Sequence, residues 1–420
     1  MRKWILWIIV VSVMISMMTG CIGGSSGCNN SFNNLIGNSS FGGSGGSGGS
    51  GYSPAIGELD TSFNGTGFVV HNNAAGGNIH DEGNSIYVDS NGKIYVTGCS
   101  VNRNGDLDMV IWRYDEEGKL DKTFGEGGIV VHDKAAGGKG DDEGNAIYVD
   151  SNGKIYVTGY SYNGRDKDMV IWRYNSDGSI DKTFGEGGIV VHDKAAGGKG
   201  DDVGYSIYVD NRERIYVTGY SYNGRDYDMV IWRYNSDGSI DKTFGKGGIV
   251  VDNSAAGANG YDYGASINVD NKGRIYVTGY SASEKTRRGD MVIWRYNEEG
   301  KLDKTFGRTG RVIYNIPIPN NIFSFGLSTY IDRGGNIYVT GFGLNMSFEP
   351  TMVICRYNED GTLDKTFANR GIVMYNKAIG TDIYVDNSGK IYVTGIRCGY
   401  FDFPESAKEL NSDMMIWKYK

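Results

Sequence analysis

The sequence has few prolines, cysteines and histidines, with 5, 5 and 4 of them among 420 residues. Charged residues make up 22% and aromatic residues 12%, which is the composition of a globular protein and not of a disordered chain. No segment after residue 20 shows a helical period of apolar residues, so a helical fold is not expected. The formal net charge of -8 argues against nucleic acid or anionic lipid as a general partner.

Motifs that mark common catalytic sites are also absent. After residue 20 the chain contains no GxSxG, HExxH or P-loop. His71, His132 and His192 each end a copy of the same motif and are expected far apart, so they cannot converge on one metal ion. His80 alone has acidic neighbours, which is a weak signal.

The N-terminus predicts an export signal. Arg2 and Lys3 precede an apolar run over residues 4–18, which is shorter than the roughly 20 residues of a membrane span. The following MTGC resembles a bacterial lipobox, although leucine is commoner where Met18 stands. The resemblance implies cleavage before Cys21 and lipidation of that cysteine. We therefore expect a signal peptide at 1–20, a flexible Gly/Ser-rich linker at 21–52, and a folded part at 53–420 in the cell envelope, facing the periplasm or the cell surface.

The rest of the chain is a repeat of about 60 residues. The motif IYVTG begins at Ile94, Ile155, Ile215, Ile275, Ile337 and Ile391, and the motifs DMVIWRY and LDKTFGEGGIVVHD recur with the same spacing. Each copy predicts four short strands, in the first copy over residues 85–89, 93–98, 108–114 and 128–132. The strands carry consecutive apolar residues, so both faces of each sheet are expected to be buried.

Four-stranded sheets covered on both faces suit an all-β, six-bladed β-propeller with four antiparallel strands per blade. The first motif copy is a lone fourth strand at 68–71, and the last is a third strand at 414–419. We expect these two segments to pair and to close the ring, because a linear solenoid would expose its end sheets.

The segments LDKTFGEGGIV, DSNGKIYVTG and DMVIWRYNSDG resemble the delta-60 repeat family of bacterial surface proteins. The resemblance covers nearly all of residues 57–420. It implies a propeller-like fold and no shared catalytic activity.

Residues that recur in every copy are expected to be structural, because equivalent positions around a ring cannot all serve one site. Aspartates such as Asp150 should bond the glycine-containing turns that follow them. Tryptophans such as Trp172 should lie as wedges between blades. The turn from Asn175 to Asp181 resembles a calcium-binding loop, but its glycine is misplaced for an EF-hand loop. No cofactor is therefore expected, and calcium is a minor alternative.

The residues that vary between copies gather in the inter-blade loops and in the turns between second and third strands, on one face of the disc. The candidate binding residues are Asp81, Asp142, Asp202, Asp262, Tyr160, Tyr162, Arg165, Tyr220, Tyr222 and Arg225. Tyrosine beside Arg and Asp can stack on a sugar and hydrogen-bond it, or anchor a protein. The alternative is solvated loops tied down by local salt bridges. Phe323, Phe325 and the loop at 400–404 mark a second candidate patch.

The cysteines suggest one crosslink. Cys99 and Cys398 occupy the same type of loop in the first and last copies, so a disulfide between them is geometrically possible if the ring closes. Cys28, in the linker, and Cys355, in a core position, are expected to be free.

These observations favour a non-catalytic binding module, lipid-anchored outside the cytoplasm, that holds a glycan, peptide or protein. One alternative is a polysaccharide lyase or hydrolase, with Asp142 or Asp202 as acid or base and Arg165 or Arg225 stabilising negative charge. Another is an assembly scaffold for an envelope complex.

Overall fold

The computed structural model describes residues 61–253, 255–257, 260–283, 288–386, 388–398 and 412–419. Within this part all regular secondary structure is β, and there is no helix long and apolar enough to cross a membrane. The chain divides into two compact units, Met1–Val70 and His71–Lys420, and every strand belongs to the second. Cys21 and the linker lie outside the described residues.

Three successive sheets have four antiparallel strands each. Their strands are β1 (Gly76–Val88), β2 (Ile94–Asn102), β3 (Leu107–Tyr114) and β4 (Ile129–His132); β5 (Asp142–Val149), β6 (Ile155–Tyr162), β7 (Lys167–Tyr174) and β8 (Ile189–His192); and β9 (Asp202–Val209), β10 (Ile215–Tyr222), β11 (Tyr227–Tyr234) and β12 (Ile249–Asp252). Each sheet therefore corresponds to one copy of the repeat.

The remaining strands form an eight-stranded and a three-stranded sheet. The first contains β13 (Asp262–Val269), β14 (Ile275–Ser283), β15 (Arg288–Tyr296), β16 (Arg311–Tyr314), β17 (Asn321–Ile331), β18 (Ile337–Asn345), β19 (Pro350–Tyr357) and β20 (Ile372–Asn376). The second contains β21 (Ala378–Val385), β22 (Ile391–Cys398) and β23 (Ser412–Tyr419). A single parallel bridge, between Gly289 and Phe323, joins two repeats into the eight-stranded sheet.

The recurring aspartates and tryptophans have the structural roles expected of them. Asp150 Oδ1 accepts the backbone N–H groups of Asn152 at 2.9 Å and Lys154 at 2.8 Å, which closes the turn between β5 and β6. Trp172 is fully buried in a cluster that joins residues of the first and second sheets, including Met109 and Ile147. Both predictions are confirmed.

A recurring arginine also ties each sheet to the next. Arg233 of β11 is 3% exposed and donates to the carboxylate of Asp241 at 2.8 Å and to the hydroxyl of Thr243 at 3.0 Å. Its Nη1 donates to the backbone carbonyl of Glu298, in the following repeat. A planar fork with donors on three separate nitrogens suits this bridge between sheets, whereas the single ammonium nitrogen of a lysine cannot reproduce that geometry.

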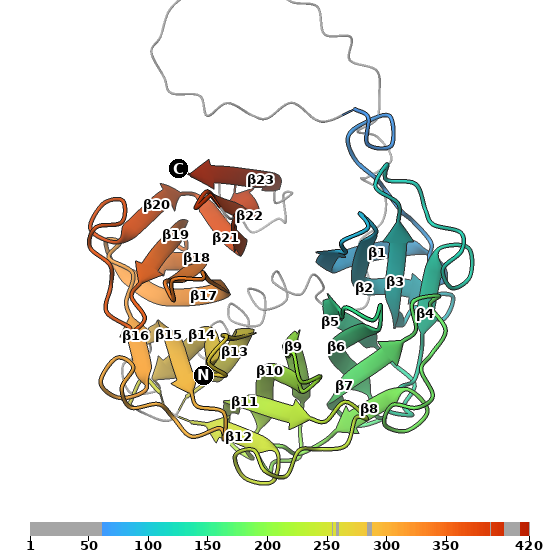
Figure 1. The fold of residues 1–420 in the computed structure, drawn as a ribbon, viewed down its shortest axis with the longest axis horizontal. Coiled ribbons are helices and arrows are strands. Elements are labelled where there is room, and N and C mark those ends of the chain that lie inside the picture. Colours follow the sequence, from blue (N-terminus) through green and yellow to red (C-terminus); the bar gives the residue numbers. More distant parts are fainter. Residues whose placement is uncertain are drawn as a thin grey trace, which may run out of the picture. The chain divides into compact units, whose positions relative to one another are not determined.

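Within the second unit, Figure 1 shows the sheets following one another in chain order, with β1, β5, β9, β13, β17 and β21 on the inner side. The arrangement is all-β and propeller-like. The prediction of six four-stranded blades closed by residues 68–71 is nevertheless wrong. The described strands form five sheets, the last sheet has three strands, and residues 68–71 belong to no strand.

The exposure of side chains in the first strand, β1, agrees with the absence of a closed ring of six blades. Ile86 and Val88 of β1 are 63% and 56% exposed, whereas the equivalent Ile147 and Val149 of β5 are 6% and 3% exposed because the preceding sheet covers them. The motif at 68–71 has the composition of a strand, but a strand exists only where its backbone groups pair with a neighbour. The sequence pattern carries no information on that pairing.

Candidate functional site

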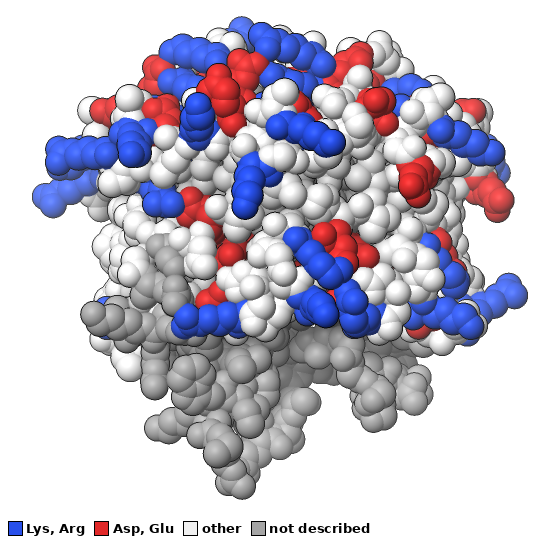
Figure 2. Space-filling model, turned by 90° about the horizontal axis from the view of Figure 1, so that it is seen from below, with Lys and Arg blue, Asp and Glu red and all other residues white. Residues whose placement is uncertain are grey.

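Two kinds of connection lie at the same end of the antiparallel sheets and form what we call the loop face. They are the loops before first strands, such as residues 133–141 and 193–201, and the turns after second strands, such as residues 163–166 and 223–226. Figure 2 shows one side of the molecule, on which lysines and arginines are interspersed with carboxylates.

The predicted carboxylates Asp142 and Asp202 hold these loops in place. Asp142 is 1% exposed, and its two oxygens accept the N–H groups of Lys134 at 2.8 Å and Ala135 at 3.2 Å. Asp202 is fully buried and bonds its own loop in the same way. Burial raises the pKa of Asp202 to about 6 despite these hydrogen bonds.

Asp81 and Asp262 repeat this arrangement. Asp81 accepts the N–H groups of Asn73 and Ala74, and Asp262 accepts that of Ala255. The expected arc of ligand-binding carboxylates is therefore not what the structure contains. A loop that folds back onto a sheet must satisfy its backbone donors, and these four aspartates do so. We remove them from the candidate site.

The predicted arginines lie at the rim of the loop face. Side chains of Arg165 and Arg225 are 55% and 54% exposed. Arg165 Nε donates to Asp166 Oδ2 at 2.8 Å, and this pair lowers the pKa of Asp166. Asp166, Asp168 and Asp193 lie close enough together to hold a metal ion, but Arg165 already supplies positive charge beside them. The rim thus has the local salt bridges of a solvated loop.

Tyr162 and Tyr222 are half-buried at the ends of β6 and β10. The ring of Tyr222 lies against the loop before β9, where a Cβ atom added to Gly200 would come 2.8 Å from its Cδ1 atom. Only glycine allows this close approach of ring and backbone. The loops therefore fix the orientation of both rings.

Tyr160 belongs to a buried polar group that sequence reasoning missed. It is 5% exposed, and its hydroxyl donates to Glu143 Oε2 at 2.7 Å. Glu143 Oε1 accepts from Asn84 Nδ2 at 2.9 Å, and Lys167 Nζ lies 3.8 Å from the centre of the Tyr160 ring. Burial raises the pKa of Glu143, with these partners opposing the shift. The sequence did contain a signal for this polar group. The residue that follows the recurring aspartate at the start of each first strand, here Glu143, differs between copies.

Tyr220 lies in a group of half-buried aromatic rings that we call the tyrosine cluster: Tyr205, Tyr220, Tyr222, Tyr227 and Tyr261. Ring centroids of Tyr220 and Tyr227 are 4.8 Å apart, those of Tyr222 and Tyr227 are 5.4 Å apart, and those of Tyr205 and Tyr220 are 5.6 Å apart. The rings thus come from three neighbouring strands, β9, β10 and β11, and from the residue directly before β13. Sequence reasoning found two of the five.

Beneath the tyrosine cluster lies a ladder of stacked rings. Tyr263, Tyr280, Phe325 and Phe342 follow one another with interplanar angles of 27°, 14° and 16°. Phe323 and Phe325 are only 3% and 5% exposed. The prediction that these two phenylalanines form an exposed patch is therefore wrong, because they fill the space between neighbouring repeats. The loop at 400–404 lies outside the described residues.

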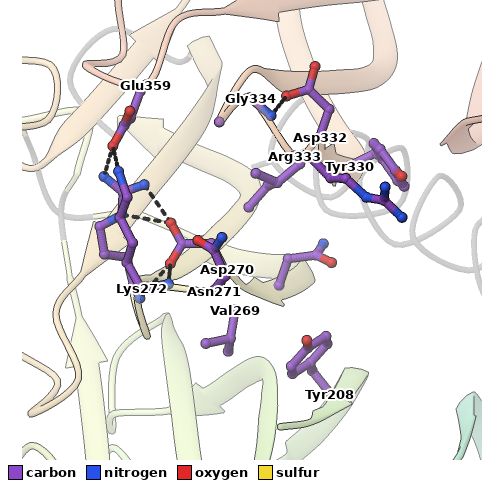
Figure 3. A pocket seen from close by; sticks show the side chains of 14 residues that line it. Tyr208, Val269, Asp270, Asn271, Lys272, Tyr330, Asp332, Arg333, Gly334 and Glu359 are labelled. Atoms are coloured by element: carbon purple, nitrogen blue, oxygen red, sulfur yellow. Dashed lines mark hydrogen bonds and ion pairs between the residues drawn. The ribbon is translucent and has the colours of Figure 1, made fainter. Parts of the chain in front are cut away.

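The opposite face has a pocket of about 300 Å³, lined by the turns at 269–274 and 331–335 with Tyr208, Tyr330 and Glu359. The Glu359 carboxylate is bonded to the side chains of Lys272 at 2.6 Å and Arg274 at 2.5 Å. Figure 3 shows Glu359 and Lys272 among the residues that line this pocket. These ion pairs join successive repeats and pair the charges of Lys272 and Arg274 with that of Glu359.

The cysteine predictions are tested in one case. Cys355 is buried and free, as expected. Cys99 is buried in a small apolar cluster. The side chain of Cys398, like Cys28, lies outside the described part, so a disulfide between Cys99 and Cys398 stays a prediction.

Comparison with known proteins supports a β-propeller repeat family. Residues 90–124, 151–184, 214–244 and 335–367 match the family described as "Domain of unknown function (DUF5122) beta-propeller". Four copies of the repeat are thus detected, and each matched segment contains the second and third strands of its copy. No curated protein matches the chain.

Solved structures resemble the chain only distantly. The polysaccharide lyase Uly1 is 11% identical, with a TM-score of 0.42 over 86% of this chain and 87% of that chain. The gluconolactonase XC5397 from Xanthomonas campestris is 13% identical, with a TM-score of 0.34 over 72% and 87%. PorZ, a surface component of the type-IX secretion system of Porphyromonas gingivalis, is 14% identical, with a TM-score of 0.39 over 73% of this chain and 38% of that chain.

Proposed function

We propose that this protein is a non-catalytic binding module that holds a glycan on its loop face. The observation that supports the proposal is the tyrosine cluster, in which several half-buried rings with phenolic hydroxyls lie together on a rigid sheet scaffold. Aromatic faces contact the carbon skeleton of a sugar, and the hydroxyls exchange hydrogen bonds with sugar hydroxyls. A peptide or protein ligand is the alternative for the same surface.

The proposal includes the expected location of the protein. A lipid on Cys21 would anchor the chain to a membrane, and the linker at 21–52 would hold the folded part away from it. Such an anchor suits a module that captures a polymer outside the cytoplasm. Labelling cells with a fatty-acid analogue tests it: Cys21→Ser should abolish labelling.

A glycan array probed with the full chain in detergent tests the binding function. Tyr222→Ala should remove a wall of the tyrosine cluster and weaken binding of any hit by about tenfold. The matched control is Tyr162→Ala, which changes the equivalent residue one sheet earlier. Equal loss in both variants, or no hit together with capture of a peptide, would contradict glycan binding at this cluster.

The buried carboxyl of Glu143 favours a second candidate function, a polysaccharide-acting lyase or hydrolase. A carboxyl group whose pKa is raised by burial and that bonds a tyrosine hydroxyl has the features of a general acid. Here Glu143 would take the role that the sequence suggested for Asp142 or Asp202. Mass spectrometry of each array hit after incubation distinguishes the two functions, because a binding module leaves its ligand intact.

A further inference from the structure

The second sheet shows how this scaffold holds an ammonium group of its own. Lys167, the first residue of β7, places Nζ 3.8 Å from the centre of the Tyr160 ring. Glu143 bonds the hydroxyl of that tyrosine and adds a carboxylate near the ammonium. A cation over an aromatic face beside a carboxylate is a stable arrangement in a half-buried site.

The third sheet has the same scaffold without that lysine. Tyr227 begins β11 where Lys167 begins β7, and Val203 replaces Glu143. Tyr220, the counterpart of Tyr160, is bordered instead by the rings of Tyr205 and Tyr227. The place beside Tyr220 that corresponds to the internal ammonium of the second sheet is therefore taken by the ring of Tyr227.

The rings of the third sheet are inclined to one another. The planes of Tyr205 and Tyr220 meet at 57°, those of Tyr220 and Tyr227 at 66°, and those of Tyr222 and Tyr227 at 60°. Rings at these angles contact one another edge to face, unlike the rings of a flat stack. The flat stack that the molecule does contain, from Tyr263 to Phe342, is buried.

Negative charge lies beside these rings. The hydroxyl of Tyr227 donates to Asp201 Oδ2 at 3.4 Å. Asp201 acts electrostatically on Tyr205, Tyr220 and Tyr227, and Glu143 of the neighbouring sheet acts on Tyr205. Carboxylates next to inclined aromatic faces favour a positively charged ligand over a neutral or acidic one.

We infer that the tyrosine cluster recognises a primary ammonium group of its ligand, and that this ligand is a glycan with unacetylated amino sugars. The inference rests on the proposed glycan-binding function and names its substrate class. The phenolic hydroxyls around the ammonium favour a hydroxyl-rich ligand over a peptide.

Calorimetry with the full chain tests this class by comparing two oligosaccharides of equal length, one of glucosamine and one of N-acetylglucosamine. Acetylation replaces the ammonium with a neutral amide, so we expect the glucosamine oligomer to bind at least about tenfold more tightly, and its binding to weaken with added salt. Equal binding would overturn the ammonium class and leave glycan binding in place. Tighter binding of a lysine peptide would overturn the glycan assignment.

A double variant places the chain's own lysine in the cluster. Val203→Glu with Tyr227→Lys reproduces the arrangement of the second sheet, which the scaffold already accommodates, and should reduce glucosamine binding by about tenfold or more through internal competition. Tyr162→Ala, which changes a residue of the second sheet outside the tyrosine cluster, serves as the control that retains binding. Full binding by the double variant, with an unchanged unfolding midpoint, would overturn the inference.

Discussion

The second and third sheets, β5–β8 and β9–β12, have nearly the same sequence and differ where the loop face is built. Their scaffold contacts are the same: Tyr174 bonds His132 at 3.0 Å, and Tyr234 bonds His192 at 3.0 Å. On the loop face the differences fall at the start of the first and third strands, where Glu143, Asn145 and Lys167 give way to Val203, Tyr205 and Tyr227. Other differences lie on the opposite face, in the turns at 151–154 and 211–214. The comparison teaches that constant residues hold the repeats together while a few variable ones make the loop face of each repeat different.

The largest effect is expected from the arginine that joins successive sheets. Arg233→Lys should lower the free energy of unfolding by about 3 kcal/mol, because one ammonium cannot replace the buried fork between Asp241 and the Glu298 carbonyl. Arg173→Lys should have the same effect if the two scaffolds are equivalent. Denaturant unfolding measures both.

The control for that prediction is Arg212→Lys, whose side chain is 66% exposed in its pair with Glu298. We expect a change of less than about 1 kcal/mol there. A large difference between Arg173→Lys and Arg233→Lys would show that the two scaffolds are not equivalent.

A smaller effect is expected from the carboxylates that hold the loops. Asp202→Asn keeps one acceptor oxygen and loses the other, so it should cost about 1 to 2 kcal/mol and speed hydrogen exchange at the amides of Lys194 and Ala195. Asp142→Asn should act likewise on Lys134 and Ala135. Unchanged exchange at these amides would contradict the role given to the aspartates, and Glu186→Gln, on an exposed residue, is the control.

The half-buried histidines His132 and His192 should make stability depend on pH in the same way in both sheets. Burial lowers the pKa of His132 and of His192 to about 4, below the value of about 6.5 in an unfolded chain. Between those values the unfolded state binds more protons, so the contribution to stability is present above about pH 6.5 and is lost as pH falls towards 4.

His192→Gln removes that contribution. The difference in unfolding free energy between the parent chain and the variant should therefore shrink as pH falls through this window. Asp202 contributes with the opposite sign, because its pKa is raised to about 6 and its ionisation opposes folding as pH rises. A difference that is constant with pH would mean that His192 titrates as it does in solution.

The smallest effect is expected where the two sheets differ. Lys167→Met removes the ammonium from the Tyr160 ring and should cost only about 0.5 to 1 kcal/mol. Val203→Ala, at the corresponding place of the third sheet, probes packing without charge. If Lys167→Met destabilised the protein by as much as Arg173→Lys, the second sheet would depend on its polar group for folding and the comparison would fail.

Local features were determined by the sequence alone. The period of about 60 residues, the β character of each strand, the turn role of Asp150 and the wedge role of Trp172 all follow from short-range patterns that repeat along the chain. Repetition makes such patterns easy to interpret, because a residue that serves every copy must serve the fold.

Pairing and burial were decided only by the tertiary structure. Residues 68–71 have the composition of a strand but pair with none, and a bridge from Gly289 to Phe323 joins two repeats into one sheet. Asp142 and Asp202 resemble surface ligands in the sequence, yet loop amides occupy them. Tyr205 and Tyr227 meet Tyr220 only because three strands converge. Such contacts join residues far apart in the chain, and their energies depend on distances that no local pattern contains.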